Sequence, residues 1–255
     1  MTAPARLAAR HIAKRFGGRA VLEDVSLDAS EHELVAVLGP SGAGKTTLFR
    51  CLTGLLAPDS GSVTVDGLDI ASLTGRRRRR VAVVFQQFNL VSRLTALENV
   101  LAGRLGHVPA WRGWLRCFER ADQRLALDCL DRVGLSAHAG QRADMLSGGQ
   151  QQRVAIARAL AQQPRLIVAD EPVSSLDPAS SAGIMELLRG IAQADGMAVV
   201  CSLHQVPFAR EYADRIVGLS HGRVTVDVVA GRFDAAAYAR VYGSPASAER
   251  STISA

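Results

Sequence analysis

The chain of 255 residues lacks any long hydrophobic run. Its longest apolar stretches, such as LIVA and MAVVCSL, are far shorter than the roughly 20 residues that a membrane-spanning helix needs. The N-terminal sequence MTAPARLAARHIAKRF has no uninterrupted apolar core of the kind found in secretory signals. We therefore expect a soluble chain in the cytoplasm.

Cysteine and aromatic residues are also scarce. The chain has four cysteines and no C-x-x-C pair, so neither a zinc site nor a disulfide framework is indicated. We expect reduced, mostly buried thiols at Cys51, Cys117, Cys129 and Cys201. Aromatic residues make up 5% of the chain, and none lies among the arginines of GRRRRR at residues 75–80, which argues against binding of single-stranded nucleic acid.

Positive charge is what the sequence has in excess. A net charge of +6 indicates an anionic partner, and nucleic acid, an anionic membrane surface or nucleotide phosphate would each fit. The run at residues 75–80 concentrates this charge. We interpret it as a solvated, arginine-rich helix that leads into the strand VAVVF, with a nucleic-acid patch as the alternative.

Short apolar segments, each ending at polar residues, predict the fold class. Such segments are typical of buried strands in a parallel sheet that is covered by helices. They lie at residues 32–40, 79–86, 165–172 and 197–204. A chain of this length can form one α/β domain with its own core, and we assign it residues 1–242.

Two further patterns predict what surrounds this sheet. Apolar and polar residues alternate at 21–29 and 61–70, with Gly or Asp-Gly turns between short strands. This pattern predicts an antiparallel β subdomain beside the parallel sheet. Apolar residues at helical spacing between about 88 and 160 predict an inserted α-helical subdomain. Residues 243–255 are small and polar, and we expect a disordered tail there.

The segment GPSGAGKT follows one of these strands directly and precedes the helical TLFRCLTGLL. It fits G-x-x-x-x-G-K-[ST], in which backbone N–H groups surround phosphate oxygens at a helix N-terminus. Lys45 would reach the β- and γ-phosphates, and Thr46 would bind Mg²⁺. The predicted phosphate-binding residues are Gly39, Pro40, Ser41, Gly42, Ala43, Gly44, Lys45, Thr46 and Thr47.

Two acidic residues end the strand LIVADEP. One carboxylate at the carboxyl end of a buried strand can hold Mg²⁺, and a second can orient and deprotonate an attacking water. Asp170 and Glu171 are the candidates, and their spacing alone does not assign the two roles.

The segment LSGGQQQRVAIARAL predicts a second anion site. A serine cap and two glycines at a helix start expose backbone N–H groups at the positive end of the helix. An ordinary N-cap with a turn is the simpler interpretation. Since the chain has only one phosphate loop, the second site could serve the nucleotide of another molecule.

LSGGQ upstream of LIVADEP, together with GPSGAGKT, resembles the ATP-binding subunit of ABC transporters over residues ~6–240. The resemblance implies an α/β P-loop NTPase with a RecA-like parallel sheet core, and ATP with Mg²⁺ as its ligands. It implies a head-to-tail homodimer in which the signature residues of one subunit close over the nucleotide held by Lys45 of the other. These residues are Ser147, Gly148, Gly149 and Gln150.

The resemblance also assigns the remaining roles. Thr46, Asp170 and Gln86 are implied to serve Mg²⁺. Glu171 is implied to polarise the water, and His204 in SLHQV to contact the γ-phosphate. Gln86 in VVFQQF is similar to the glutamine that carries motion to the permease. Two further similarities are Phe16 as the aromatic that stacks on adenine and residues 175–177 as the loop after the catalytic acid.

The run FQQFNLVSRLTALENVLAGRLG, followed by PAWRGWL, resembles the phosphonate importer ATPases more narrowly. This implies import of an organophosphonate, phosphite or a related oxyanion, which a binding protein delivers to a membrane permease. The subunit would lie at the cytoplasmic face of the membrane, with no nucleic-acid partner. The uniform arginine run and the tail after Tyr242 depart from the family pattern.

Three alternatives accompany this hypothesis. A soluble ABC-family ATPase that acts on DNA or ribosomes would explain the arginine run, and an importer subunit for another small solute would share every ATPase motif. A small-molecule kinase would share the phosphate loop but would not explain LSGGQ. Trp111 and Trp114 are three residues apart and share a helix face, so they either pack in the core or contact the permease.

Overall fold

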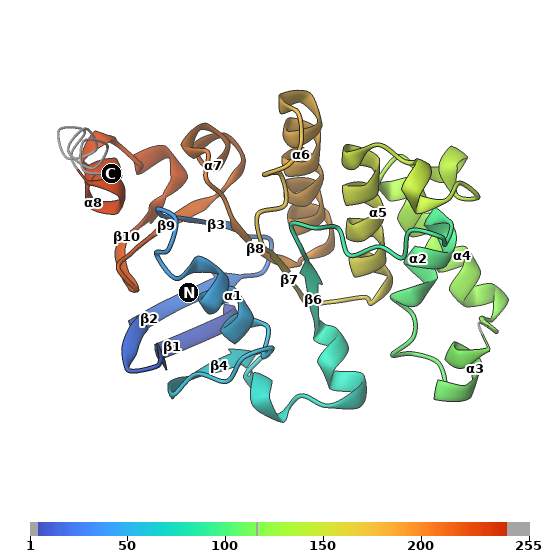
Figure 1. Ribbon diagram of the computed structural model, residues 1–255, viewed down its shortest axis with the longest axis horizontal. Coiled ribbons are helices and arrows are strands. Elements are labelled where there is room, and N and C mark those ends of the chain that lie inside the picture. Colours follow the sequence, from blue (N-terminus) through green and yellow to red (C-terminus); the bar gives the residue numbers. More distant parts are fainter. Residues whose placement is uncertain (1–4, 116, 244–255) are drawn as a thin grey trace.

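The computed structural model describes residues 5–115 and 117–243. A six-stranded sheet forms the centre, in the order β10-β9-β3-β8-β7-β6 (Figure 1). The four predicted strands are confirmed and pair in parallel, and only β10 runs antiparallel to its neighbour. The strands are β3 (Leu34–Leu38), β6 (Val81–Val84), β7 (Leu166–Ala169), β8 (Ala198–Ser202), β9 (Arg215–Ser220) and β10 (Arg223–Val229).

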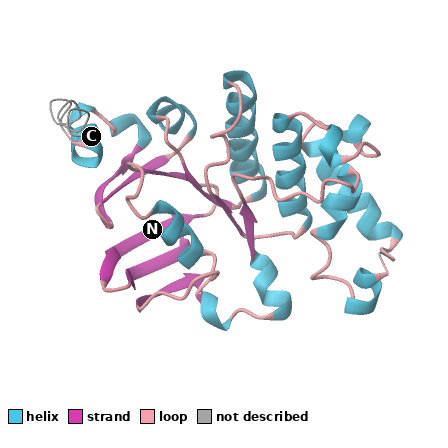
Figure 2. Ribbon diagram, in the orientation of Figure 1, coloured by secondary structure: helices cyan, strands magenta, loops and turns pink. Residues whose placement is uncertain are grey.

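A second, antiparallel sheet lies beside the first, as the alternating segments predicted. Its order is β2-β1-β4-β5, and helix α1 (Lys45–Leu52) lies between the two sheets (Figure 2). Val35 and Val37 of β3 pack toward this second sheet, whereas Leu34, Ala36 and Leu38 pack on helices, because successive side chains point to opposite faces of a strand. The strands are β1 (Ala5–Phe16), β2 (Arg19–Ser30), β4 (Ser60–Val65) and β5 (Leu68–Asp69).

The inserted helical subdomain leaves the sheet after β6 and returns to it at β7. Its helices α2, α4 and α5 pack on one another, which confirms the predicted insertion. The four helices are α2 (Ala96–Ala102), α3 (Ala110–Trp114), α4 (Arg120–Arg132) and α5 (Gly148–Ala161). The other helices are α6 (Pro178–Asp195), α7 (Val206–Tyr212), α8 (Ala235–Tyr242) and the short 3-10 helices η1 (Ile70–Ser72), η2 (Gly75–Arg80), η3 (Ser136–His138), η4 (Ala143–Met145) and η5 (Ala230–Arg232).

A buried amide fixes the start of this subdomain. The side chain of Asn99 on α2 accepts a hydrogen bond from Val91 N at 2.8 Å and donates to Val91 O at 3.1 Å. It also donates to Thr95 O at 3.0 Å, and Asn99 is 1% exposed. Thr95 and Glu98 form a capping box that begins α2. The segment that precedes α2 is therefore held against the helix.

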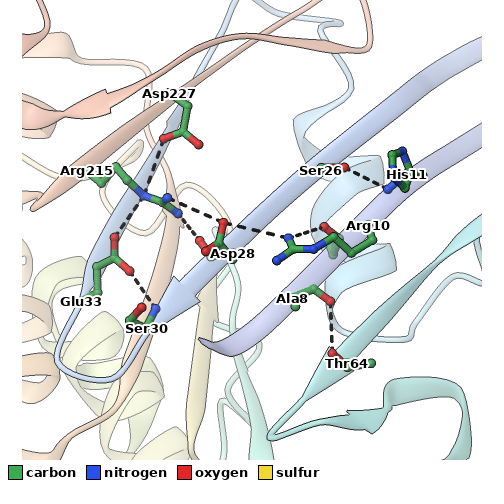
Figure 3. Close-up of polar contacts among 11 residues, drawn as sticks. Ala8, Arg10, His11, Ser26, Asp28, Ser30, Glu33, Thr64, Arg215 and Asp227 are labelled. Atoms are coloured by element: carbon green, nitrogen blue, oxygen red, sulfur yellow. Dashed lines mark hydrogen bonds and ion pairs between the residues drawn. The ribbon is translucent and has the colours of Figure 1, made fainter. Parts of the chain in front are cut away.

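Arg215 joins the two sheets through a group of acidic side chains (Figure 3). Its Nε atom lies 3.0 Å from Glu33 Oε1 and 3.6 Å from Asp227 Oδ1, and its Nη1 atom lies 3.7 Å from Asp28 Oδ1. Burial raises the pKa of the Asp227 carboxyl, while the Arg215 charge opposes the rise and Asp28 adds to it. One guanidinium thus ties β2, β9 and β10 to the turn before β3.

The arginine run forms η2 and leads into β6, as predicted, but it is not a solvated face. Arg77 is exposed, whereas Arg78 and Arg80 are half-buried. The guanidinium of Arg78 donates to Thr53 O, and Arg80 Nη1 lies 2.6 Å from Asp66 Oδ2. The interpretation as a solvated helix is therefore wrong for these two residues, because they connect η2 to the chain around α1 and β4.

The remaining expectations have mixed outcomes. Three of the four thiols are buried and Cys117 is exposed. Residues 244–255 of the expected tail lie outside the described residues. No helix among the described residues is long and apolar enough to cross a bilayer.

Candidate nucleotide site

The phosphate loop, residues 39–46, connects β3 to α1 and surrounds one ammonium group. Lys45 is 6% exposed, and its Nζ atom donates to Gly39 O at 2.7 Å and to Pro40 O at 3.2 Å. Gly44 has a φ of 103°, and a Cβ atom there would lie 2.9 Å from Val21 O, so a glycine is required at this turn. Burial lowers the pKa of Lys45, and the carboxylates of Glu171 and Asp170 oppose that shift.

Asp170 and Glu171 follow β7 at the edge of the sheet that also carries the phosphate loop. Asp170 N donates to Val84 O at 2.9 Å, which continues the pairing of β6 with β7. Ser202, the last residue of β8, lies between the two acids. Its hydroxyl donates to Asp170 Oδ1 at 2.7 Å and accepts a hydrogen bond from Glu171 N at 2.7 Å.

Ser202 was not predicted as a site residue, although it holds both acids. It is 0% exposed, so its hydroxyl must be satisfied inside the protein. A signal for it is present in MAVVCSLH, where a serine ends a strand two residues before His204. Its partners are more than 30 residues away in the chain, which is why the sequence pattern alone does not show them.

Glu171 and His204 meet at the mouth of the phosphate loop. Glu171 has a φ of 50°, in the left-handed region that side chains rarely adopt, and its Oε1 lies 2.5 Å from His204 Nε2. The two residues line a hollow of about 410 Å³ together with residues of the loop. The lining comprises Val21, Ser41, Gly42, Gly44, Lys45, Thr46, Thr47, Glu171 and His204.

The composition of this hollow fits nucleotide phosphate with a divalent cation. Loop N–H groups and Lys45 supply positive charge at a helix N-terminus, where phosphate binds readily. Thr46 in its lining, and Asp170 next to Glu171 but outside the lining, offer oxygen ligands, which Mg²⁺ prefers. Of the predicted loop residues, Gly39, Pro40 and Ala43 do not line the hollow, and the others surround it with Glu171 and His204. Their roles toward a nucleotide remain predictions.

The signature residues do not line this hollow. Ser147 caps α5: its hydroxyl accepts from Gln150 N at 3.3 Å, and Ser147 N donates to Gln150 Oε1 at 2.9 Å. Gly148 and Gly149 form the first turn of α5. One chain on its own therefore presents the phosphate loop and the signature segment as separate features.

Gln86 and Phe16 also stand apart from the hollow. Gln86 is exposed and lines a different cavity of about 550 Å³, with Phe88, Asp144 and Ser175 among its neighbours. Phe16 ends β1 and is 50% exposed, which leaves its ring accessible. The assigned roles of both residues remain predictions.

Both tryptophans lie on the surface, on α3. Trp111 is 59% exposed and Trp114 is 85% exposed. The interpretation of these rings as core residues is wrong, because the one-turn helix that carries them lies at the edge of the helical subdomain (Figure 1).

One edge of the parallel sheet carries the phosphate loop, the paired acids and the histidine. This arrangement defines a P-loop ATPase, here with an inserted helical subdomain. The sequence profile of the ABC transporter family matches residues 22–174. The chain belongs to the ABC transporter family, in which it is an ATP-binding, ATP-hydrolysing subunit. The resemblance read from LSGGQ, LIVADEP and GPSGAGKT is thus confirmed.

Curated relatives match almost the whole chain. The hypophosphite import ATP-binding protein HtxD of Stutzerimonas stutzeri is 49% identical over 241 residues, which cover 93% of this chain and 71% of that protein. The phosphonates import ATP-binding protein PhnC of Nitratidesulfovibrio vulgaris is 46% identical over 242 residues, with 93% and 91% covered. The phosphonates import ATP-binding protein PhnC 3 of a Nostoc species is 50% identical over 231 residues, with 89% and 88% covered.

Solved structures show the same fold. A dimeric ATP-binding cassette in a post-hydrolysis state, bound to ADP and Pi, has a TM-score of 0.74 and 36% identity, with 88% of this chain and 98% of that chain covered. The ADP conformation of another ABC transporter cassette has a TM-score of 0.78 and 27% identity, with 88% and 91% covered. The predicted P-loop NTPase architecture is therefore confirmed.

Proposed function

We propose that this subunit hydrolyses ATP to power the import of phosphonates, or of related oxyanions such as hypophosphite and phosphite. The similarity to importers of these compounds is the observation that carries the proposal, since it extends over about nine-tenths of the chain and includes the helical insertion. The subunit would act at the cytoplasmic face of the membrane, bound to permease subunits. A substrate-binding protein would deliver the solute to these permease subunits.

The hollow at the phosphate loop supports definite roles for its residues. Glu171 accepts the proton of the attacking water, and His204 fixes the Glu171 carboxylate and contacts the terminal phosphate. Lys45 neutralises the phosphate charge from within the loop. Mg²⁺, held by Thr46 and Asp170 and approached by Gln86, would neutralise developing charge on the phosphate oxygens.

The separation of the two anion sites supports a homodimer. Ser147, Gly148, Gly149 and Gln150 of one subunit would cover the nucleotide on the phosphate loop of the other. Dimeric solved relatives with the same architecture favour this arrangement. ATP would join the subunits, and hydrolysis would separate them. Phe16, whose ring is accessible at the end of β1, would stack on the adenine.

Capture of the partner proteins tests the proposed identity of the transported solute. A tagged chain expressed in its own host should co-purify with a permease and a binding protein. Phosphonate, phosphite or hypophosphite should then raise the thermal unfolding temperature of that binding protein. Stabilisation by a sugar or peptide instead would end the oxyanion proposal and leave the ATPase assignment intact.

The nucleic-acid alternative loses its main support. Arg78 and Arg80 of the run on which it relied are engaged with Thr53 and Asp66 inside the fold. Salt-dependent binding of duplex DNA or ribosomes, without recruitment to membranes, would restore it.

A further inference from the structure

Helix α3 and the residues next to it expose four large apolar side chains. It lies at the end of the molecule opposite α8 (Figure 1). Besides Trp111 and Trp114, the neighbouring Leu105 is 48% exposed and Leu115 is 56% exposed. Single exposed apolar side chains are common on proteins, but a contiguous group of large ones marks an interaction surface. We call residues 105–115 the tryptophan segment.

The packing of α3 keeps its indoles outside. Gly113 faces Leu105, and a Cβ atom there would lie 2.8 Å from Leu105 Cδ2. The helix therefore lies close against Leu105 through its glycine. Trp111 and Trp114, three residues apart, lie on a common side of this helix turn. The indoles form a protruding edge rather than the wall of a cavity.

The sequence on either side of α3 is rich in positive charge. Residues 104–124 contain five arginines and two acidic residues, so their net charge is +3, half that of the whole chain. Both acids are paired internally: Arg104 Nε lies 2.9 Å from Asp122 Oδ1, and Arg112 bonds Glu119. The Arg112 guanidinium also lies 5.3 Å from the Trp111 ring centroid. Arg120 and Arg124, by contrast, are exposed, so their charge faces solvent.

We propose that the tryptophan segment contacts the interface of an anionic lipid bilayer directly. Indole rings concentrate at the boundary between headgroups and acyl chains, because they combine a large apolar body with one N–H donor. Arg112, which contacts the Trp111 ring, and the exposed arginines at the start of α4 would be attracted by anionic headgroups. Apolar insertion and electrostatic attraction act together in interfacial segments of this kind.

A bilayer fits this surface better than a protein partner does. Protein interfaces place their aromatic anchors in pockets, whereas the 85% exposed indole of Trp114 protrudes. The apolar hollow of about 270 Å³ next to α3, lined in part by Leu101, Leu105 and Phe118, is where a protein anchor would bind instead. The indoles do not line that hollow.

Intrinsic fluorescence tests the proposal, because Trp111 and Trp114 are the only tryptophans in the chain. The full chain, without permease, is mixed with phosphatidylcholine vesicles and with vesicles that also contain phosphatidylglycerol. With the anionic vesicles we expect emission at shorter wavelength and co-sedimentation, both weakened by salt. The double variant Trp111→Ser/Trp114→Ser should bind these vesicles about tenfold more weakly or worse.

Val229→Ser is the matched control. Val229 is 60% exposed on β10, away from α3, so its loss should leave vesicle binding unchanged. Both variants should keep the ATPase rate of the wild type, since neither position lies at the nucleotide site. The proposal is overturned if anionic vesicles change neither emission nor sedimentation. It is also overturned if emission changes only with vesicles that contain the permease, because the partner is then a protein. Neither outcome affects ATP hydrolysis, so a failure here is distinct from a failure of the proposed function.

Discussion

The imidazole of His204 and the carboxylate of Glu171 lie 2.5 Å apart, Nε2 to Oε1, at the mouth of the phosphate loop. They follow β8 and β7, which are adjacent parallel strands, so the sheet itself brings them together. Their side chains are 40% and 19% exposed, which places the contact at the edge between protein and solvent. In the proposed function His204 also contacts the terminal phosphate, so this contact would let it control where the Glu171 carboxylate points.

Glu171→Gln should abolish turnover while nucleotide binding is retained. The amide keeps the size of the side chain but cannot accept the proton of the attacking water, so kcat should fall by about 100-fold or more. ATP should then hold the variant as a dimer. Phosphate release and size-exclusion chromatography with ATP and Mg²⁺ measure both effects.

Glu186→Gln, an exposed change on α6, serves as the control and should behave as the wild type. A Glu171→Gln protein that hydrolyses ATP normally and stays monomeric in saturating ATP would contradict both the base assignment and the dimer.

Ser202→Ala should weaken the response to Mg²⁺. Without the hydroxyl, Asp170 loses the donor that orients it and Glu171 N–H loses its acceptor. We expect a loss of about 1–3 kcal/mol in the free energy of unfolding. The Mg²⁺ concentration for half-maximal ATPase should also rise. Ser181→Ala removes another buried hydroxyl, which donates to Val173 O, and should affect stability alone. Identical Mg²⁺ curves for the two variants would exclude a positioning role for Ser202.

Arg78→Ala should destabilise the fold, whereas Arg77→Ala should not. The half-buried Arg78 guanidinium satisfies Thr53 O, so its loss leaves a carbonyl unpaired at a cost of about 1–3 kcal/mol. Arg77 is exposed, and its substitution should stay within about 0.5 kcal/mol of the wild type. Urea unfolding midpoints distinguish the two. Equal midpoints would show that the run is only a charged surface.

Asp227→Asn should stabilise the protein at neutral pH. The pKa of Asp227 is raised in the folded state, chiefly by burial, so its contribution to stability is present below the unfolded pKa and is lost as the pH rises through the folded pKa. Asparagine carries no charge, so the variant does not bear the cost of burying an ionised carboxylate at neutral pH. The advantage of the variant in thermal unfolding temperature should therefore shrink as the pH falls toward 4. Asp128→Asn, on the exposed side of α4, is the control. An advantage that does not depend on pH would contradict the assignment.

Features carried by local patterns could be predicted from the sequence. The strand that ends at Ala169 and the loop that ends at Lys45 each depend on a few consecutive residues, and the structure confirms both. The hydroxyl of Ser202 could not be assigned in this way, because its role depends on two acids from the neighbouring strand. The engagement of Arg78 with Thr53 likewise arises only when η2 folds back on the end of α1.

The exposure of the two tryptophans could not be predicted from the sequence either. The spacing of Trp111 and Trp114 predicts a shared helix face and does not say whether that face is covered. The fold decides the question, since α3 approaches Leu105 through Gly113 and both rings are exposed. The grouping of Gln86 with Ser175 in a separate hollow also required the fold.

The four hydrogen bonds of the Asn99 side chain, to Val91 N, Val91 O, Leu94 O and Thr95 O, have a mechanical consequence. They tie the stretch from Val91 to Thr95 to α2, so we expect this stretch and the helix to move together. In the proposed function a movement begins near the nucleotide and passes through the residues after Gln86. The tightness of the connection at Asn99 would then set how much of that movement reaches the distant edge where the tryptophans lie.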